Sequence, residues 1–199
     1  MSTRLFGTQP YITIVSGLPR SGTSLMMRML EAGGMEVMVD HLRQPDEDNP
    51  YGYYELEQAK KIKADASFLD NAHGKAFKMV SMLLSDLPND KQYKIVFMKR
   101  HLGEVLASQR IMLQRSGKSV QEDDDIEMRR IFQKHLHEIA SWLAEQQNMA
   151  VIYVNYNDLM QHPLASAKAV NRFLGNRLDV RKMAAVVDQR LYRNKAFPD

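Results

Sequence analysis

Short apolar runs rich in β-branched residues alternate along the chain with segments of helical periodicity. The apolar runs predict buried strands at Ile12–Val15, Ala76–Val80, Tyr93–Met98 and Ala150–Val154. Apolar residues at three- and four-residue spacing predict helices at Ser24–Ala32, Leu56–Lys63, Glu104–Gln114, Ile126–Gln146, Pro163–Phe173 and Val180–Gln189. Such alternation is typical of a parallel sheet with helices on its faces. We therefore expect one α/β domain over residues 1–199, with three layers and a central parallel sheet of four to five strands.

The turn after the first predicted strand has the features of a phosphate-binding loop. Gly17 and Gly22 have the spacing of the ATP-binding P-loop, G-x-x-x-x-G-K-S/T, and Thr23 and Ser24 open a predicted helix. Such a turn presents backbone N–H groups to an anion at a helix N-terminus. Thr23 stands where the P-loop has its lysine, and Arg20 supplies a cation inside the loop instead. The loop therefore predicts a P-loop-type fold whose ligand is a phosphate-rich donor other than ATP.

The second part of an ATP-dependent site is also missing. Metal-assisted phosphoryl transfer needs an acidic residue at the end of an apolar strand to hold magnesium. The third predicted strand instead ends in Lys99 and Arg100, and the fourth has its acid, Asp158, too far beyond the strand end. Together with Arg20 and Lys78, these cations could neutralise a charged donor without a metal. We therefore expect no bound metal.

Two segments, taken together, resemble the sulfotransferases that use 3′-phosphoadenosine 5′-phosphosulfate (PAPS). Leu18–Ser24 is similar to the family's 5′-phosphosulfate loop, in the Pro-Arg-Ser-Gly-Thr form of tyrosylprotein sulfotransferases and many bacterial relatives. Ile95–Ser108 is similar to the 3′-phosphate motif, in which an arginine at a strand end and a serine eight residues later hold that phosphate. A weaker likeness follows at Val151–Leu159. The resemblance implies metal-independent transfer of a sulfuryl group from PAPS to a hydroxyl or amine, which leaves 3′-phosphoadenosine 5′-phosphate (PAP).

The resemblance also assigns residues to the donor site. Arg100 and Ser108 correspond to the 3′-phosphate pair. Lys78 lies on the strand where the family has a lysine that neutralises the bridging oxygen between the phosphate and the departing sulfuryl group. Arg193, in a short basic segment, could fold back onto the 3′-phosphate as the family's C-terminal segment does, or belong to a frayed tail. The residues assigned to the 5′-phosphosulfate are Pro19, Arg20, Ser21, Gly22, Thr23 and Ser24.

The general base that removes the acceptor's proton has no single assignment. The cytosolic members carry a histidine two residues after the catalytic lysine, but this chain has Val80 there. The tyrosylprotein branch uses a glutamate downstream of the loop, and the candidates here, all in the long connection 35–55, are Glu36, Asp40, His41 and Glu55. A neutral histidine or a carboxylate of raised pKa can accept a hydroxyl proton near neutral pH. The position relative to the loop favours Asp40 and His41 over Glu55 and Glu36.

Composition narrows the partners and the setting. The 27 basic and 24 acidic residues give a formal charge of +3, which arginines around one anionic cofactor explain without a nucleic-acid surface. The chain has no cysteine, no pattern of a secretory signal and no stretch of the ~18 apolar residues that a membrane helix needs. We expect a cytoplasmic enzyme with a small-molecule or peptide acceptor, without a nucleic-acid or membrane partner. The pattern is silent on oligomeric state.

Two other functions fit parts of the pattern. A P-loop nucleotide or small-molecule kinase would share the fold, and magnesium-dependent binding of ATP would reveal it, although the loop lysine is absent. A non-catalytic module that binds PAP or PAPS as a sensor is also open, because the histidine of the cytosolic members is missing. Measured sulfuryl transfer would exclude this second alternative.

Overall fold

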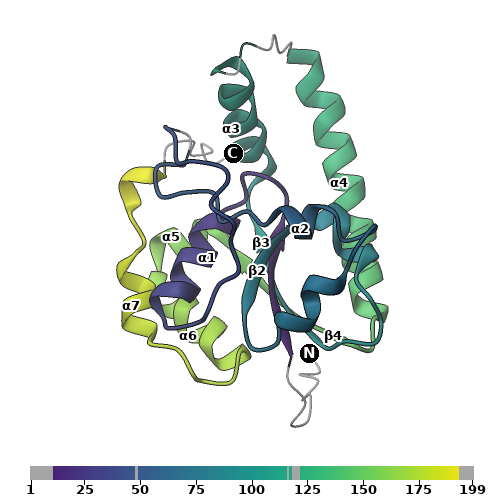
Figure 1. Ribbon diagram of the computed structural model, residues 1–199. Coiled ribbons are helices and arrows are strands. Elements are labelled where there is room, and N and C mark those ends of the chain that lie inside the picture. Colours follow the sequence, from purple (N-terminus) through teal and green to yellow (C-terminus); the bar gives the residue numbers. More distant parts are fainter. Residues whose placement is uncertain (1–10, 48, 116, 118–121, 193–199) are drawn as a thin grey trace.

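A parallel four-stranded sheet forms the centre of the molecule (Figure 1). The computed structural model describes residues 11–47, 49–115, 117 and 122–192. Its strands, in the spatial order β2-β1-β3-β4, are β1 (Ile12–Gly17), β2 (Ala76–Val80), β3 (Tyr93–Lys99) and β4 (Met149–Asn155). Each neighbouring pair of strands is parallel. The predicted α/β fold with a central parallel sheet is confirmed, and the sheet has four strands.

Helices cover both faces of the sheet and complete three layers. One face carries α1 (Thr23–Ala32), α5 (Tyr156–Gln161), α6 (Pro163–Phe173) and α7 (Val180–Ala185). The other carries α2 (Glu57–Lys60), the 3₁₀ helices η1 (Ser67–Asn71) and η2 (Ser81–Asp86), and part of α4 (Glu122–Glu145). The helix α3 (Leu102–Arg115) and the adjoining part of α4 extend beyond the sheet (Figure 1). Within the described residues, no helix is both long and apolar enough to cross a membrane.

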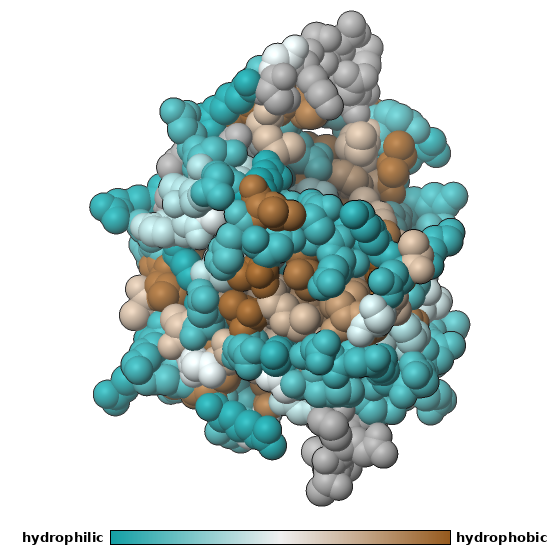
Figure 2. Space-filling view, viewed as in Figure 1, coloured by the Kyte–Doolittle hydropathy of each residue, from teal (hydrophilic) through white to brown (hydrophobic). Residues whose placement is uncertain are grey.

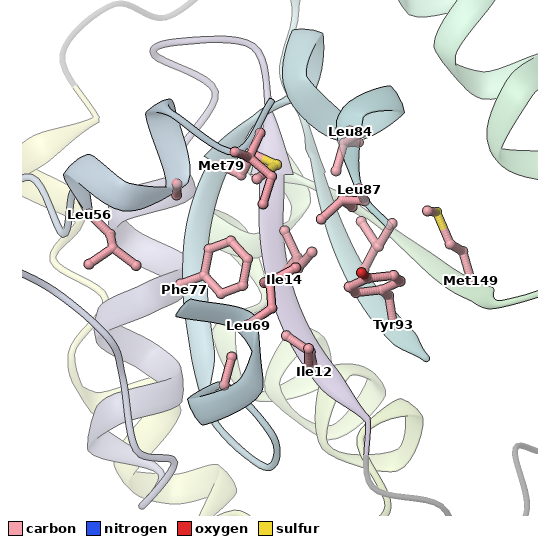
Figure 3. Close-up of a cluster of buried hydrophobic side chains, with 14 of the residues drawn as sticks. Ile12, Ile14, Leu56, Leu69, Phe77, Met79, Leu84, Leu87, Tyr93 and Met149 are labelled. Atoms are coloured by element: carbon pink, nitrogen blue, oxygen red, sulfur yellow. The ribbon is translucent and has the colours of Figure 1, made fainter. Parts of the chain in front are cut away.

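Side chains of the strands alternate between the two layers. In β1, Ile12 and Ile14 pack on one face against Phe77 (Figure 3), and Val15 packs on the other face with Met26. All six residues of β1 are buried. A strand covered on both faces needs apolar residues at nearly every position, which is why the sequence shows continuous runs. Figure 2 shows the outside of the molecule from the same direction, with hydrophobic surface near its centre and hydrophilic residues around it.

The register brings the carboxyl ends of three strands to one edge of the sheet. Gly17, the last residue of β1, pairs with Val80 of β2 and with Met98 of β3. Residues that follow these strand ends therefore lie near one another, although they are far apart in the sequence. This edge is where the candidate site lies.

The helices differ from the predicted ranges mainly where they are short. The helix predicted over Leu56–Lys63 is the single turn α2, and the helix predicted over Val180–Gln189 is α7 followed by η3 (Gln189–Leu191). The helices η1, η2 and α5 were not predicted. They have five or six residues each, which is too short to show a repeating pattern of apolar positions. A local signal marks α5, because the Asn155 side chain accepts hydrogen bonds from two backbone N–H groups of its first turn.

Candidate active site

A cavity of about 370 Å³ opens at the carboxyl ends of the strands. Gly17 lines it at the end of β1, Val80 at the end of β2, and Arg100 just beyond β3. The loop after β1, the start of α1, residues 49–56, α2 and α3 contribute to the remaining walls. Ligands of open parallel sheets bind in this place, beyond the strand ends.

Two glycines shape the loop between β1 and α1. A Cβ atom on Gly22, whose φ is 98°, would lie 2.4 Å from the Tyr156 ring, and one on Gly17 would lie 2.6 Å from the Met98 carbonyl oxygen. The helix α1 begins after Gly22 without a side chain that caps its first N–H groups. Such N–H groups, at the positive end of the helix dipole, form an anion site. The loop can therefore cradle a phosphate or sulfate group.

The two predicted phosphate motifs meet beside this cradle. The Arg20 Nε atom donates to the Ser108 hydroxyl at 2.9 Å, and the Arg100 Nη1 atom donates to the Arg20 carbonyl oxygen at 3.1 Å. Arg20 has a φ of 70°, a left-handed conformation that costs a non-glycine residue about 1 kcal/mol or more. The parallel pairing of β1 with β3 brings the motifs together across about 80 residues of sequence.

A carboxylate that the sequence analysis did not single out holds Arg100. The Glu104 Oε2 atom lies 2.8 Å from Arg100 Nε, and the two side chains are only 1% and 8% exposed. Glu104 Oε1 accepts hydrogen bonds from Asn157 Nδ2 at 2.8 Å and from the Tyr192 hydroxyl at 2.9 Å. The four-residue spacing of Arg100 and Glu104 was the signal in the sequence. Asn157 had no such signal. Tyr192 opens the short basic segment that could fold back onto the 3′-phosphate by resemblance to the family.

Lys78 reaches the cavity from β2. Its Nζ atom donates to the Tyr53 carbonyl oxygen and lies 3.4 Å from the Ser24 hydroxyl, which also donates to that carbonyl, at 2.9 Å. Burial lowers the pKa of Lys78 to about 8, because the charged form is less stable away from water, while the Glu55 carboxylate opposes the shift. Lys78 is therefore mostly protonated at neutral pH. Its contact with a backbone carbonyl is one that no side-chain pattern in the sequence reveals.

Of the four base candidates, Glu55 lines the cavity. Its Oε1 atom lies 3.1 Å from Arg43 Nη1 and its Oε2 atom 2.7 Å from Lys60 Nζ. Burial raises the pKa of Glu55, but the hydrogen bond from Lys60 and the charges of Lys78, Lys60 and Arg43 outweigh burial and hold the pKa below its ordinary value. Glu55 is therefore an ionised carboxylate near the Lys78 ammonium. Arg43 and Lys60 were not singled out in the sequence.

The other three base candidates lie outside the cavity lining. Asp40 accepts the backbone N–H groups of Leu42 at 3.0 Å and of Glu57 at 2.5 Å, so its carboxylate caps the start of α2. Burial raises the pKa of Asp40, but these two N–H groups, together with neighbouring charges such as that of Lys60, outweigh burial and lower the pKa. His41 is exposed, and Glu36 forms an ion pair with Lys75 at 2.6 Å.

Most of the residues predicted to bind the donor line the main cavity. Ser21, within the loop, is buried and lines a smaller cavity together with Lys99, and its hydroxyl has no hydrogen-bond partner among the described residues. Arg193 lies outside the described residues. The structure brings the rest together in the main cavity: Pro19, Arg20, Gly22, Thr23, Ser24, Lys78, Arg100 and Ser108.

A loop that can hold a phosphate or sulfate group, with several cations at the carboxyl edge of a parallel sheet, is typical of enzymes that handle such groups. The family model of the sulfotransferase domain matches residues 11–196, and the chain belongs to the sulfotransferase family. The resemblance found in the sequence is thereby confirmed. The chain is an enzyme of sulfuryl transfer, and a kinase is not favoured.

Solved sulfotransferase structures share this fold. A sulfotransferase from Mycobacterium tuberculosis is 17% identical, with a TM-score of 0.63 over 90% of this chain and 72% of the other. The sulfotransferase domain of the Synechococcus PCC 7002 olefin synthase is 16% identical, with a TM-score of 0.55 over 97% and 92%. Retinol dehydratase in complex with androsterone and the inactive cofactor PAP is 19% identical, with a TM-score of 0.51 over 90% and 62%. Comparison with curated protein sequences gave no significant match.

Proposed function

We propose that this sulfotransferase takes its sulfuryl group from PAPS and passes it to a hydroxyl or amine group of a small-molecule or peptide acceptor. The observation that carries the proposal is the convergence of a glycine cradle and the three predicted cations, Arg20, Lys78 and Arg100, on one cavity. PAPS bears a phosphosulfate at its 5′ position and a phosphate at its 3′ position, so it needs two anion contacts. The cradle between Gly17 and Gly22 fits the first, and Arg100 with Ser108 fits the second.

In this proposal the cradle of residues 19–24 binds the 5′-phosphosulfate, and Arg20 neutralises part of its charge. Arg100 and Ser108 bind the 3′-phosphate. The contact between the Arg20 Nε atom and the Ser108 hydroxyl supports this assignment, since it sets the two anion contacts next to each other. The presence of PAP in retinol dehydratase, which shares the fold, supports the choice of donor.

PAPS supplies a sulfur atom whose bond to the 5′-phosphate oxygen breaks as the bond to the acceptor oxygen or nitrogen forms. Lys78 neutralises the negative charge that grows on the departing phosphate oxygen, and it must be protonated to do so. Glu55 receives the proton of the acceptor group. The cradle and Arg20 hold the donor in line with the acceptor, so that the chain contributes mainly positioning and charge neutralisation.

Glu55 takes the role of base ahead of Asp40 and His41. It lines the cavity together with Lys78, and Arg43 and Lys60 fix the direction of its carboxylate. Both oxygens of Asp40 instead serve backbone N–H groups at the start of α2. Because a carboxylate of low pKa is a weak base, the acceptor's proton moves to Glu55 as the new bond to sulfur forms.

The acceptor side of the cavity is largely apolar. Its walls come from α2 and the residue before it, the end of β2, η2 and α3, and include Leu56, Ala59, Val80, Leu83, Ile111 and Met112. An acceptor with an apolar body gains free energy by burying that body here. Its reactive hydroxyl or amine would then face Glu55 and Lys78.

Binding of PAP tests the choice of donor. PAP should raise the melting temperature without added metal, and by more than ADP or ATP with magnesium, because the site has a 3′-phosphate contact and lacks the P-loop lysine. At a hundredfold excess over Kd the expected stabilisation is about 2.7 kcal/mol. Arg100→Ala should remove most of the gain. Arg130→Ala, whose arginine pairs with Glu127 on the surface of α4, should keep it. Equal stabilisation by ATP with magnesium would contradict the proposal.

Transfer is tested with isotope-labelled PAPS and a pool of hydroxyl and amine metabolites. The label should appear on an acceptor with the wild-type chain and be strongly reduced with Lys78→Met or Glu55→Gln. Tight binding of PAP without transfer to any acceptor would favour a non-catalytic PAP-binding module instead.

A further inference from the structure

We infer that Glu104 is a positioning residue for Arg100, and that with Asn157 and Tyr192 it gives the nucleotide site its preference for a 3′-phosphate. The inference rests on the proposed function, in which Arg100 binds that phosphate. Glu104 does not line the cavity, whereas Arg100 does. Its influence on a bound nucleotide therefore passes through the guanidinium.

Hydrogen bonds occupy both oxygens of the Glu104 carboxylate. Oε2 accepts from Arg100 Nε at 2.8 Å, and Oε1 accepts from Asn157 and Tyr192. On the guanidinium, the Nε edge faces Glu104 and Nη1 donates to the Arg20 carbonyl oxygen. A carboxylate held from two sides has one orientation, and it transmits that orientation to the arginine.

Aromatic rings fix the plane of the same guanidinium. Its central carbon lies 4.4 Å from the centre of the Tyr156 ring and 5.9 Å from that of Tyr192, and the two rings meet edge to face. The Tyr156 ring also fills the space beside Gly22, where a Cβ atom would lie 2.4 Å away. One ring thus contacts both the arginine and the cradle. This packing would fix the distance between the two proposed anion contacts.

A carboxylate next to a phosphate-binding arginine reduces the positive charge that the ligand meets, so attraction does not explain it. An arginine buried without a counter-charge strongly destabilises a fold. Glu104 supplies that counter-charge from the first turn of α3, where the helix dipole favours a carboxylate. The ion pair therefore weakens the attraction of Arg100 for a phosphate but fixes the position of its guanidinium. A fixed guanidinium is what recognition of a phosphate at one particular position requires.

PAP and AMP form a matched pair of probes, because they differ only in the 3′-phosphate. Calorimetry would give the Kd of each for the wild-type chain and for Glu104→Gln. We expect the Kd for PAP to rise about tenfold, as for a lost charge-assisted contact, and the Kd for AMP to stay within about twofold. The direction of the change in the Kd for PAP is decisive, since loss of the negative charge of Glu104 would by itself tighten PAP binding. Unchanged or tighter PAP binding would overturn the inference.

A double-mutant cycle tests whether Glu104 acts through Arg100. In an Arg100→Ala background, Glu104→Gln should cause no further change in the ratio of the PAP and AMP affinities. A further loss of that ratio would show that Glu104 acts by another route and would overturn its positioning role. The control is Glu127→Gln, which removes an exposed carboxylate paired with Arg130 and should leave both Kd values unchanged.

Tyr192→Phe tests the same link if Glu104→Gln fails to fold. It removes one donor to Glu104 and keeps the ring beside Tyr156. The expected result is an increase of about threefold in the Kd for PAP without a change for AMP, and equal changes for both would overturn the inference. A wild-type chain that does not prefer PAP to AMP would instead overturn the proposed function, so the two failures are distinguishable.

Discussion

Two carboxylates near the same cavity are held in different ways. The Glu104 side chain is 1% exposed and pairs with Arg100, which is 8% exposed. The Glu55 side chain is 17% exposed and pairs with Arg43 and Lys60, which are 44% and 50% exposed. Water competes with the ion pairs of Glu55, whereas it barely reaches those of Glu104. In the proposed function, Glu104 and Arg100 belong to the nucleotide end of the cavity and Glu55 to the acceptor end. The nucleotide end would then be the more rigid of the two, and the acceptor end the more open to water.

The backbone supports this contrast. Glu104 lies on α3, and its partner Asn157 lies on α5, so regular helices position both. Glu55 and Arg43 lie in the connection between α1 and α2, where the Arg43 guanidinium packs 3.3 Å from the centre of the Tyr53 ring. Connections vary and move more readily than the elements they join. The same connection also supplies the Tyr53 carbonyl that accepts from Lys78 and Ser24, so it joins the two ends of the cavity.

Lys78 lies between the two ends and should give the largest effect. Lys78→Met should lower turnover by about 10²–10³-fold, because the charge it meets develops mainly in the transition state. The affinity for PAP should change only severalfold for the same reason. Turnover is measured in the labelled-PAPS assay and affinity by calorimetry. Equal losses of turnover and of PAP affinity would mean that Lys78 acts mainly in binding the nucleotide.

Stability provides the control for this variant. The folded pKa of Lys78, about 8, lies below the ordinary value of 10.5, so folding disfavours its charged form. The free-energy cost of burying charged Lys78 is therefore at its full value below pH 8 and becomes smaller as the pH rises toward 10.5. Lys78→Met should raise the melting temperature at pH 7 and raise it less at pH 10. A variant that cannot fold would show that the lysine is structural.

Glu55→Gln should give the next largest effect, a fall in turnover of about 10²-fold at unchanged PAP affinity, as for a lost general base. Glu57→Gln is the matched control. Glu57 pairs with the same Lys60 at 2.5 Å but does not line the cavity, so its loss should leave turnover near that of the wild type. If Asp40→Ala rather than Glu55→Gln abolished turnover, the base would be Asp40 and the acceptor end would be arranged differently.

Two arginine variants compare the ends directly. Arg100→Ala should weaken PAP binding by about 1.5–3 kcal/mol, the scale of a hydrogen bond to a charged group. Arg43→Ala should weaken it by less than about 1 kcal/mol, because its exposed ion pair is screened by water. Calorimetry with PAP measures both. Equal losses would mean that Arg43 also binds the nucleotide, and the contrast between the ends would disappear.

The pH dependence of turnover should reflect the Lys78 ammonium. Since its pKa in the free protein is about 8, kcat/KM for PAPS should fall above pH 8, by about tenfold per pH unit once well beyond it. The negative charge of bound donor favours the protonated lysine, so the fall in kcat should begin at a higher pH. In Lys78→Met, the residual activity should no longer fall above pH 8. If the activity of this variant still fell at alkaline pH, the fall would reflect the titration of a group other than Lys78.

The smallest expected effect concerns Asp40. Because its carboxylate caps the start of α2, Asp40→Ala should lower the free energy of unfolding by about 1 kcal/mol and leave turnover per folded molecule unchanged. Thermal unfolding and the transfer assay measure the two quantities. His41→Ala, at an exposed neighbouring position, should alter neither one.

The sequence predicted the nucleotide end in more detail than the acceptor end. The cradle and the pair Arg100 and Ser108 each lie within a short segment, where residue spacing encodes geometry, and their meeting required only that β1 and β3 be parallel neighbours. The base candidates lie in a long connection without a period. Spacing there could not distinguish Glu55, which lines the cavity, from Asp40 and His41, which do not.

By itself, the sequence determined the strands, the P-loop-type turn without its lysine and the resemblance to sulfotransferases. Local periodicity and short motifs are sufficient for these, because they depend on residues close together in the chain. Only the tertiary structure decided that the Tyr53 carbonyl holds Lys78, that Asn157 and Tyr192 hold Glu104, and that burial lowers the pKa of Lys78. Burial and long-range hydrogen bonds depend on which distant segments pack together, and that packing is a property of the whole fold.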